Sequence, residues 1–218
     1  MTKVKVCGNT NAEDVTLAIS LGVDYLGFIF AESKRRIEPT MAARIITAVP
    51  DFKNFVGVFV NHPKKDVEQI SQDLGIKILQ FHGDETALYC QYFMDHGFQV
   101  IKTFRIKDAM SLKRMDEYNV AAFLFDAFQK DSSGGTGIPF DWNLIEKNPY
   151  VQEKLFLAGG LNPDNLEDAI QKIHPYAVDV ASGVEKSPGK KDPVLLERFI
   201  SIAKNSLGLS SGPPSRDP

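Results

Sequence analysis

Cysteine and histidine are scarce in this chain, and their scarcity argues against two kinds of protein. Only two of the 218 residues are Cys and only four are His. Two isolated thiols do not make a disulfide framework, and they favour a reducing compartment, the cytoplasm. The chain also has no Cys-x-x-Cys pair and no His-Glu-x-x-His motif. The sequence therefore predicts no metal site.

Long apolar runs and an excess of positive charge are missing as well. No stretch of about 18 apolar residues is present, so we expect no membrane-spanning segment. The first residues lack the apolar run of a signal peptide. The net charge is −3, and the Lys and Arg side chains are scattered among acidic residues, as on a solvated surface. These features predict a cytoplasmic protein without a membrane or nucleic-acid partner.

The chain does contain a regular alternation of short apolar runs with helical patterns. The expected strands cover residues 3–7, 25–30, 55–60, 77–81, 99–104, 121–125, 154–157 and 177–180. The expected helices cover residues 11–21, 40–49, 65–74, 85–96, 109–118, 142–146, 163–173 and 193–203. Nearly continuous apolar strands are typical of a parallel sheet covered by helices. Eight strand–helix pairs predict an α/β fold, a single eight-stranded parallel (β/α)8 TIM barrel, with an open doubly wound sheet as the alternative.

The chain length suits one domain and is short for two. We expect the catalytic barrel to cover residues 1–205. The segment 206–218 is rich in Ser, Gly and Pro, a composition typical of a disordered tail.

Two reactive side chains follow expected strands, where the active sites of such barrels lie. Cys7 ends the first strand, and Gly8 after it lets the backbone turn sharply. A thiol there becomes a base or nucleophile when positive charge or amide dipoles surround it, whereas most free cysteines are small buried apolar residues. Asp126 follows the sixth strand, where partial burial suits a general acid and a capping or loop role is the alternative.

Glycine-bearing loops follow the last two strands. Gly159 and Gly160 come after the seventh strand, and Ser182 and Gly183 after the eighth. In this fold, backbone amides at these two places bind phosphate, together with the amino end of a short extra helix. The pair of loops therefore predicts a small phosphorylated substrate.

Two further features point to the same kind of ligand. The glycine-rich run 132–137, which includes Gly135, can fold over a ligand or serve as a flexible linker. Arg35 lies in the loop after the second strand, where a guanidinium can hold a carboxylate with two hydrogen bonds. Arg36 competes for that role, and a solvated basic loop is the alternative.

Together these segments resemble the phosphoribosylanthranilate isomerase family, in one frame over about residues 3–204. The matching motifs are Lys5–Thr10, Gly27–Phe30, Ser33–Arg35, Gly57–Asn61, Gln80–Gly83, Asp126, Gly134–Gly137, Phe140–Trp142, Gly159–Pro163, Asp179–Glu185 and Pro188–Asp192. The resemblance implies an enzyme of tryptophan biosynthesis that needs no cofactor and acts as a monomer or homodimer. Its reaction would be the Amadori rearrangement of N-(5-phosphoribosyl)anthranilate to 1-(2-carboxyphenylamino)-1-deoxyribulose 5-phosphate.

The resemblance also implies a role for each matching residue. Asp126 matches the general acid that protonates the furanose ring oxygen, and Cys7 matches the general base that removes the C2′ proton. Arg35 matches the arginine for the anthranilate carboxylate, although Arg36 stands where the family often has an aromatic residue, so either arginine is a candidate. His82 is expected to contact the substrate. The residues expected at the phosphate are Gly159, Gly160, Ser182 and Gly183, with Gly135 closing over it.

Other phosphosugar enzymes and a non-catalytic binder are the alternatives. A phosphoribosyl-formimino isomerase of histidine synthesis would have Asp in place of Cys7 and a second glycine-rich loop near the middle of the chain, where residues 61–63 are Asn-His-Pro. A pentulose-phosphate epimerase would need several strand-end histidines, and only His82 ends a strand. A binder without chemistry would have no need of both Cys7 and Asp126.

Overall fold

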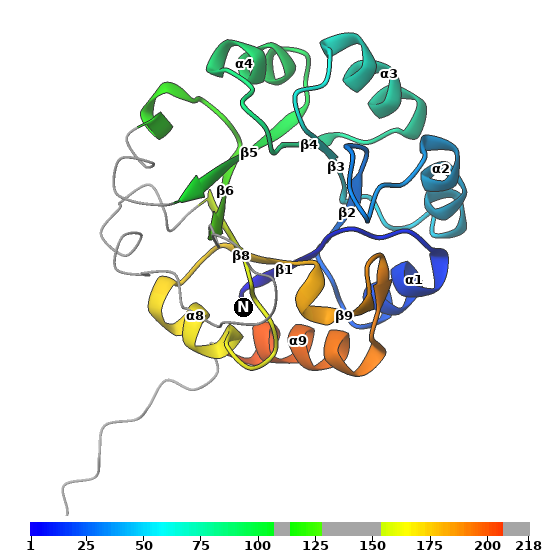
Figure 1. The fold of residues 1–218 in the computed structure, drawn as a ribbon, viewed down its shortest axis with the longest axis vertical. Coiled ribbons are helices and arrows are strands. Elements are labelled where there is room, and N and C mark those ends of the chain that lie inside the picture. Colours follow the sequence, from blue (N-terminus) through cyan, green and yellow to red (C-terminus); the bar gives the residue numbers. More distant parts are fainter. Residues whose placement is uncertain (107–113, 128–153, 207–218) are drawn as a thin grey trace, which may run out of the picture.

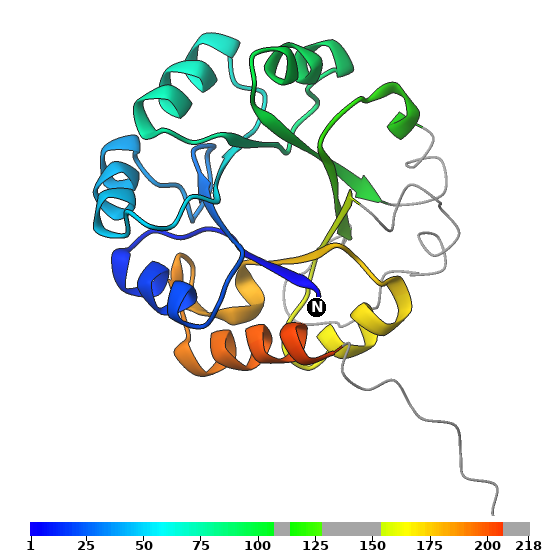
Figure 2. The same ribbon diagram turned by 180° about the vertical axis from the view of Figure 1, so that it is seen from behind.

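A computed structural model describes residues 1–106, 114–127 and 154–206, and in it eight strands close into a parallel barrel in chain order (Figures 1 and 2). The strands are β1 (Lys3–Val6), β2 (Tyr25–Ile29), β3 (Phe55–Phe59), β4 (Ile78–Phe81), β5 (Gln99–Ile106), β6 (Ala122–Ala127), β7 (Leu155–Ala158) and β8 (Ala177–Val180). The barrel closes because β1 pairs in parallel with β8 along its whole length. The predicted barrel is confirmed, and the open sheet is excluded.

Helices surround the barrel (Figure 1). They are α1 (Ala12–Ser20), α2 (Pro39–Ala48), α3 (Lys64–Leu74), α4 (Ala87–Asp95), α8 (Leu166–Ile173) and α9 (Pro193–Asn205), with 3-10 turns η1 (Arg114–Glu117) and η2 (Ser182–Val184). Side chains of Asn11, Thr86 and Asp192 accept hydrogen bonds from the first backbone amides of α1, α4 and α9. These caps fix where the helices begin. Across the described ranges, no helix has the length and apolar character needed to cross a membrane.

The core has two parts because strand side chains alternate between the barrel interior and the helices. Most of the apolar core lies between the strands and the helices, as Phe28, Phe59 and Phe125 do. A smaller cluster fills the barrel itself. It consists of Val56, Ile78, Ile101, Ala122, Leu124, Phe156, Ala158 and Ala177. At the carboxyl ends of the strands, the side chains that face the interior lie in the mouth of the barrel.

The structure corrects several expected boundaries. Helix α4 begins at Ala87 rather than residue 85, and α8 begins at Leu166 rather than residue 163. Strand β6 runs through Asp126, which is therefore a strand residue and not the first loop residue. A hairpin of β9 (Glu185–Ser187) and β10 (Lys190–Lys191) follows β8 and was not predicted.

Some expectations fall partly or wholly outside the described residues. Within the expected helix 109–118, residues 114–118 are described, and they contain the 3-10 turn Arg114–Glu117. The expected helix 142–146, the glycine-rich run 132–137 and residues 207–218 lie outside. The domain boundary near residue 205 and the disorder of the tail stay predictions.

Candidate active site

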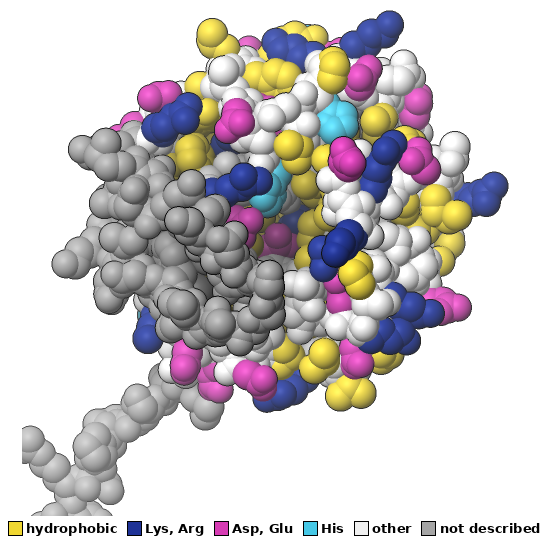
Figure 3. Space-filling view, viewed as in Figure 1, with side chains coloured by type: hydrophobic (Ala, Val, Ile, Leu, Met, Phe, Trp, Pro, Cys, Tyr) yellow, Lys and Arg dark blue, Asp and Glu magenta, His cyan; other side chains and the backbone are white. Residues whose placement is uncertain are grey.

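A cavity of about 420 Å³ opens at the carboxyl ends of the strands. Acidic and histidine side chains appear in the hollow near the centre of the face seen in Figure 3. Most of the predicted site residues line this cavity: Cys7, Arg35, His82, Asp126, Gly159, Gly160 and Ser182. Gly183 is not one of the lining residues, and Gly135 lies outside the described residues. The topology thus gathers residues from β1, β4, β6, β7 and β8 at one place.

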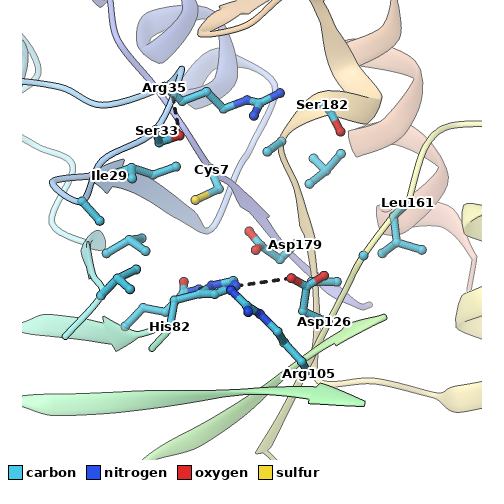
Figure 4. A pocket seen from close by; sticks show the side chains of 18 of the residues that line it. Cys7, Ile29, Ser33, Arg35, His82, Arg105, Asp126, Leu161, Asp179 and Ser182 are labelled. Atoms are coloured by element: carbon cyan, nitrogen blue, oxygen red, sulfur yellow. Dashed lines mark hydrogen bonds and ion pairs between the residues drawn. The ribbon is translucent and has the colours of Figure 1, made fainter. Parts of the chain in front are cut away.

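Cys7 comes directly after β1 and directs its sulfur into the cavity (Figure 4). Its backbone amide donates to the carbonyl of Val180 at 2.8 Å, which continues the pairing of β1 with β8. Gly27 on the neighbouring strand makes room for the thiol, because a Cβ at that position would lie only 2.7 Å from Cys7 Sγ. Cys7 is 6% exposed, so the residue is both buried and part of the cavity wall.

Three charged groups act on the Cys7 thiol. Burial raises its pKa, and the ammonium of Lys5 is the strongest group that opposes this change. Asp179 raises the pKa further, and Lys191 lowers it. The net shift is upward. Positive charge near the thiol lowers its pKa, but less than burial raises it. Lys5 provides most of this positive charge.

Asp126 faces the cavity from β6, beside His82 at the end of β4 (Figure 4). The distance between His82 Nε2 and Asp126 Oδ2 is 3.3 Å. Gln80 Nε2 lies 3.1 Å from His82 Nδ1. With the Gln80 amide nitrogen donating to Nδ1, a neutral imidazole carries its proton on Nε2, which faces Asp126. The Asp126 side chain is 32% exposed, which leaves its carboxyl group accessible to a ligand.

Arg35, and not Arg36, lines the cavity. Its Nε and Nη2 donate to the carboxylate of Glu185 at 2.8–2.9 Å. Arg36 instead pairs with Glu38 at 3.1 Å, and both side chains are more than half exposed. A Cβ at Gly8 would lie 2.7 Å from Arg35 Cδ, so the absence of a side chain at Gly8 leaves room for Arg35 to pass over the end of β1.

The loops after β7 and β8 meet beside the cavity. Gly159 and Gly160 both have positive φ, at 88° and 70°, a conformation that suits glycine. Gly183 packs against Leu161, whose carbonyl oxygen would overlap a Cβ at that position. The expected extra helix is only the three-residue turn η2, which contains Ser182. Gly183 therefore allows the two loops to approach, while Ser182 faces the cavity.

Sequence reasoning missed a set of buried charges next to the predicted residues. Lys5 Nζ lies 2.8 Å from Asp179 Oδ1 inside the barrel. Lys191 Nζ donates to the carbonyl of Cys7 at 2.6 Å and lies 3.0 Å from Glu185 Oε1. The period-two alternation of β1 could have placed Lys5 on the same side as Cys7. No local pattern connects Glu185 with Arg35, 150 residues away.

The site contains the groups needed for proton transfer. A thiol and a carboxyl group face one cavity from β1 and β6, which allows one to act as base and the other as acid on the same ligand. Among the residues that the structure describes, no three His, Cys, Asp or Glu side chains are grouped to hold a metal ion.

Comparisons with known proteins agree on one family. The model of the family described as N-(5'-phosphoribosyl)anthranilate (PRA) isomerase matches residues 4–202. An N-(5'-phosphoribosyl)anthranilate isomerase of Pelobacter propionicus is 45% identical over 97% of this chain and 100% of its own length. The crystal structure of phosphoribosyl anthranilate isomerase from Thermotoga maritima is 38% identical, with a TM-score of 0.84 over 96% of this chain and 100% of that one.

A further similar structure contains a ligand. It is a phosphoribosyl anthranilate isomerase in complex with reduced 1-(o-carboxyphenylamino)-1-deoxyribulose 5-phosphate. It is 37% identical to this chain, with a TM-score of 0.81 over 96% of this chain and 100% of that one.

Proposed function

This chain belongs to the N-(5'-phosphoribosyl)anthranilate isomerase family, and we propose that it converts N-(5-phosphoribosyl)anthranilate to 1-(2-carboxyphenylamino)-1-deoxyribulose 5-phosphate in tryptophan biosynthesis. The observation that carries the proposal is the placement of Cys7 and Asp126 on one cavity, facing it from different sides (Figure 4). The rearrangement moves protons and redistributes electrons within one molecule. It therefore needs one acid and one base that reach the same ligand.

Asp126 acts first in the proposed reaction. It donates a proton to the furanose ring oxygen, the C1′–O bond breaks, and the ring opens to a Schiff base between C1′ and the anthranilate nitrogen. The His82 Nε2–H that faces Asp126 Oδ2 at 3.3 Å orients the carboxyl group toward the ligand. The other carboxyl oxygen is then free to deliver the proton.

Cys7 acts second. Its thiolate takes the C2′ proton, the electron pair of that C–H bond forms the C1′–C2′ double bond, and the Schiff-base nitrogen gains the displaced pair. The resulting enolamine tautomerises to the ketone product. A base held at a fixed position relative to the bound substrate makes this step effectively unimolecular.

The two ends of the substrate would be held by opposite parts of the cavity wall. The loops at Gly159–Gly160 and Ser182–Gly183 offer backbone amides to the phosphate. Arg35 offers its guanidinium to the anthranilate carboxylate, because Glu185 occupies Nε and Nη2 but not Nη1. Closure of Gly135 over the phosphate stays part of the proposal. We also propose a cytoplasmic location and a monomeric or homodimeric state.

Loss of anthranilate-type fluorescence in the presence of freshly prepared substrate tests the function. We expect rapid loss with the wild type, and a fall in kcat of roughly 10²–10⁴-fold for Cys7→Ala and for Asp126→Asn. Cys90→Ala is the matched control, since Cys90 is also buried but lies in α4 and does not line the cavity. Ligand binding without turnover by the folded wild type would instead indicate a binding protein without catalysis.

A further inference from the structure

A lysine is buried in the barrel one layer below Cys7. Lys5 and Cys7 are two positions apart on the same chain segment, so both point into the barrel. The Lys5 side chain is 0% exposed, and its Nζ lies 2.8 Å from Asp179 Oδ1. Asp179 is the register partner of Lys5 on β8, is 10% exposed and lines the cavity. In the view of Figure 4, Asp179 lies between Cys7 and Asp126.

Stability alone gives little reason for this ion pair. Burying two charges costs several kcal/mol per ion, and apolar replacements of such pairs are often neutral or stabilising. Below the mouth, the interior also holds the apolar side chains of Val56, Leu124 and Phe156. An ammonium placed here instead of a further apolar group therefore points to a role in the chemistry above it.

We propose that Lys5 is a positioning residue whose ammonium stabilises the Cys7 sulfur as a thiolate, and that Asp179 fixes this ammonium below the cavity floor. The inference rests on the proposed function, in which Cys7 is the base. When the thiolate takes the C2′ proton, Lys5 keeps its own proton, and the electron pair of the C–H bond neutralises the protonated Schiff base. Lys5 thus stabilises the reactant base without entering the proton transfer.

The charges around Cys7 support this assignment. Burial lowers the pKa of Lys5, but Asp179 and Cys7 raise it to a net value above the ordinary one, so the group stays charged. Burial lowers the pKa of Lys191, and Glu185 only partly opposes this. Lys191 also gives its hydrogen bonds to carbonyls and to Glu185. Of the two lysines, Lys5 is therefore the one whose positive charge acts mainly on the Cys7 sulfur. Asp126 and His82 face Cys7 from across the cavity.

Two substitutions with opposite expected effects test the proposal. Lys5→Met removes the ammonium at similar side-chain length, and we expect Cys7 to ionise about one pH unit or more higher. Asp179→Asn removes the negative charge and keeps an oxygen for Lys5, so Cys7 should ionise at lower pH. The readouts are the pH dependence of Cys7 alkylation by iodoacetamide, followed by peptide mass spectrometry, and the pH profile of kcat/KM. A merely structural role would lower activity in both variants without moving the profiles in opposite directions.

Lys3→Met is the matched control. Lys3 lies on the same strand and face as Lys5, one step further from Cys7, and its ammonium lies over the rings of Tyr25 and Tyr176. Its removal takes the same charge from the chain and should leave the Cys7 profile in place. If Lys5→Met does not fold, the double variant Lys5→Met/Asp179→Asn is used. This variant should still raise the pKa of the Cys7 thiol, because Lys5 affects that pKa more strongly than Asp179 does.

Alkylation needs no substrate, so the two proposals can fail separately. An unchanged alkylation profile in the folded Lys5 variant, with normal wild-type turnover, would overturn the role of Lys5 alone. A shifted profile in a protein that never turns over the substrate would support Lys5 as the group that controls Cys7 and would overturn the isomerase function.

Discussion

At the scale of single residues, Gly27 decides how closely the barrel wall fits around Cys7. A Cβ there would lie 2.7 Å from Cys7 Sγ and 3.2 Å from its Cα. The thiol must then move or the strands must separate. We expect Gly27→Ala to lower the free energy of unfolding by about 1–3 kcal/mol, as overpacking does. We also expect kcat to fall by roughly tenfold or more, because Cys7 is the proposed base and small displacements of a base cost rate.

Gly57→Ala separates the two effects. A Cβ at Gly57 would meet the ring of Phe59 at 2.8 Å, on the helix side of β3 and away from the cavity. Thermal unfolding and steady-state kinetics of both variants should show a stability loss in each and a loss of kcat only for Gly27→Ala. Equal kcat values in the two variants would show that the position of the Cys7 sulfur is not so tightly constrained.

The site residues that could be predicted from the sequence are those that directly follow an expected strand. Cys7 and His82 each follow an apolar run, and their place at the cavity could be predicted from that alone. Lys5 and Asp179 lie inside such runs, where a charge breaks the apolar pattern without showing what it pairs with. Their contact depends on closure of the barrel between β1 and β8, which spacing along the chain does not determine.

At the scale of elements, the hairpin β9–β10 holds the side chains that surround Arg35. Glu185 accepts the Arg35 guanidinium and the Lys191 ammonium, and these cations keep its pKa below the ordinary value although burial raises it. Glu185 therefore stays ionised at neutral pH and fixes two of the nitrogens of Arg35. The third nitrogen, Nη1, is the one that we propose for the anthranilate carboxylate.

We expect Glu185→Gln to weaken substrate binding. The amide has one acceptor oxygen and no charge, so Arg35 loses charge-assisted hydrogen bonds that are worth about 1.5–3 kcal/mol each. KM should rise by roughly tenfold with little change in kcat, since the contact proposed for Arg35 lies away from the reacting atoms. Glu38→Gln, which removes the exposed partner of Arg36, should change neither constant. A lower KM in Glu185→Gln would mean that Glu185 competes with the substrate for Arg35.

The order of strands could be predicted because each is a continuous apolar run, but the ends of several elements could not. Glu85 has a good helical propensity, yet α4 begins after it because its carboxylate turns toward Lys102 at 2.8 Å. Thr86 then caps the helix. The β9–β10 hairpin is short and polar, so its residues 185–191 carry no alternation that would distinguish them from a loop.

At the scale of the whole molecule, the ion pair of Lys102 and Glu85 connects three segments of the barrel. Lys102 lies on β5, and both side chains are almost fully buried, at 3% and 1% exposed. Glu85 also accepts the backbone amides of Asn61 and Gly83 at 2.7 and 2.9 Å. The pair therefore fixes the loops after β3 and β4, beside the His82 corner of the cavity.

Removal of one partner should destabilise the whole fold. Lys102→Met leaves the Glu85 carboxylate buried without its cation, which costs about 3–5 kcal/mol and should lower the melting temperature by roughly 10 °C. Lys204→Met is the control. Lys204 Nζ lies 2.6 Å from Asp24 Oδ2, and both side chains are about a quarter exposed. Removal of that partly hydrated pair should cost about 1 kcal/mol or less. Thermal unfolding of both variants measures the difference. Equal losses would mean that water reaches Glu85 and that the pair does not hold the loops together.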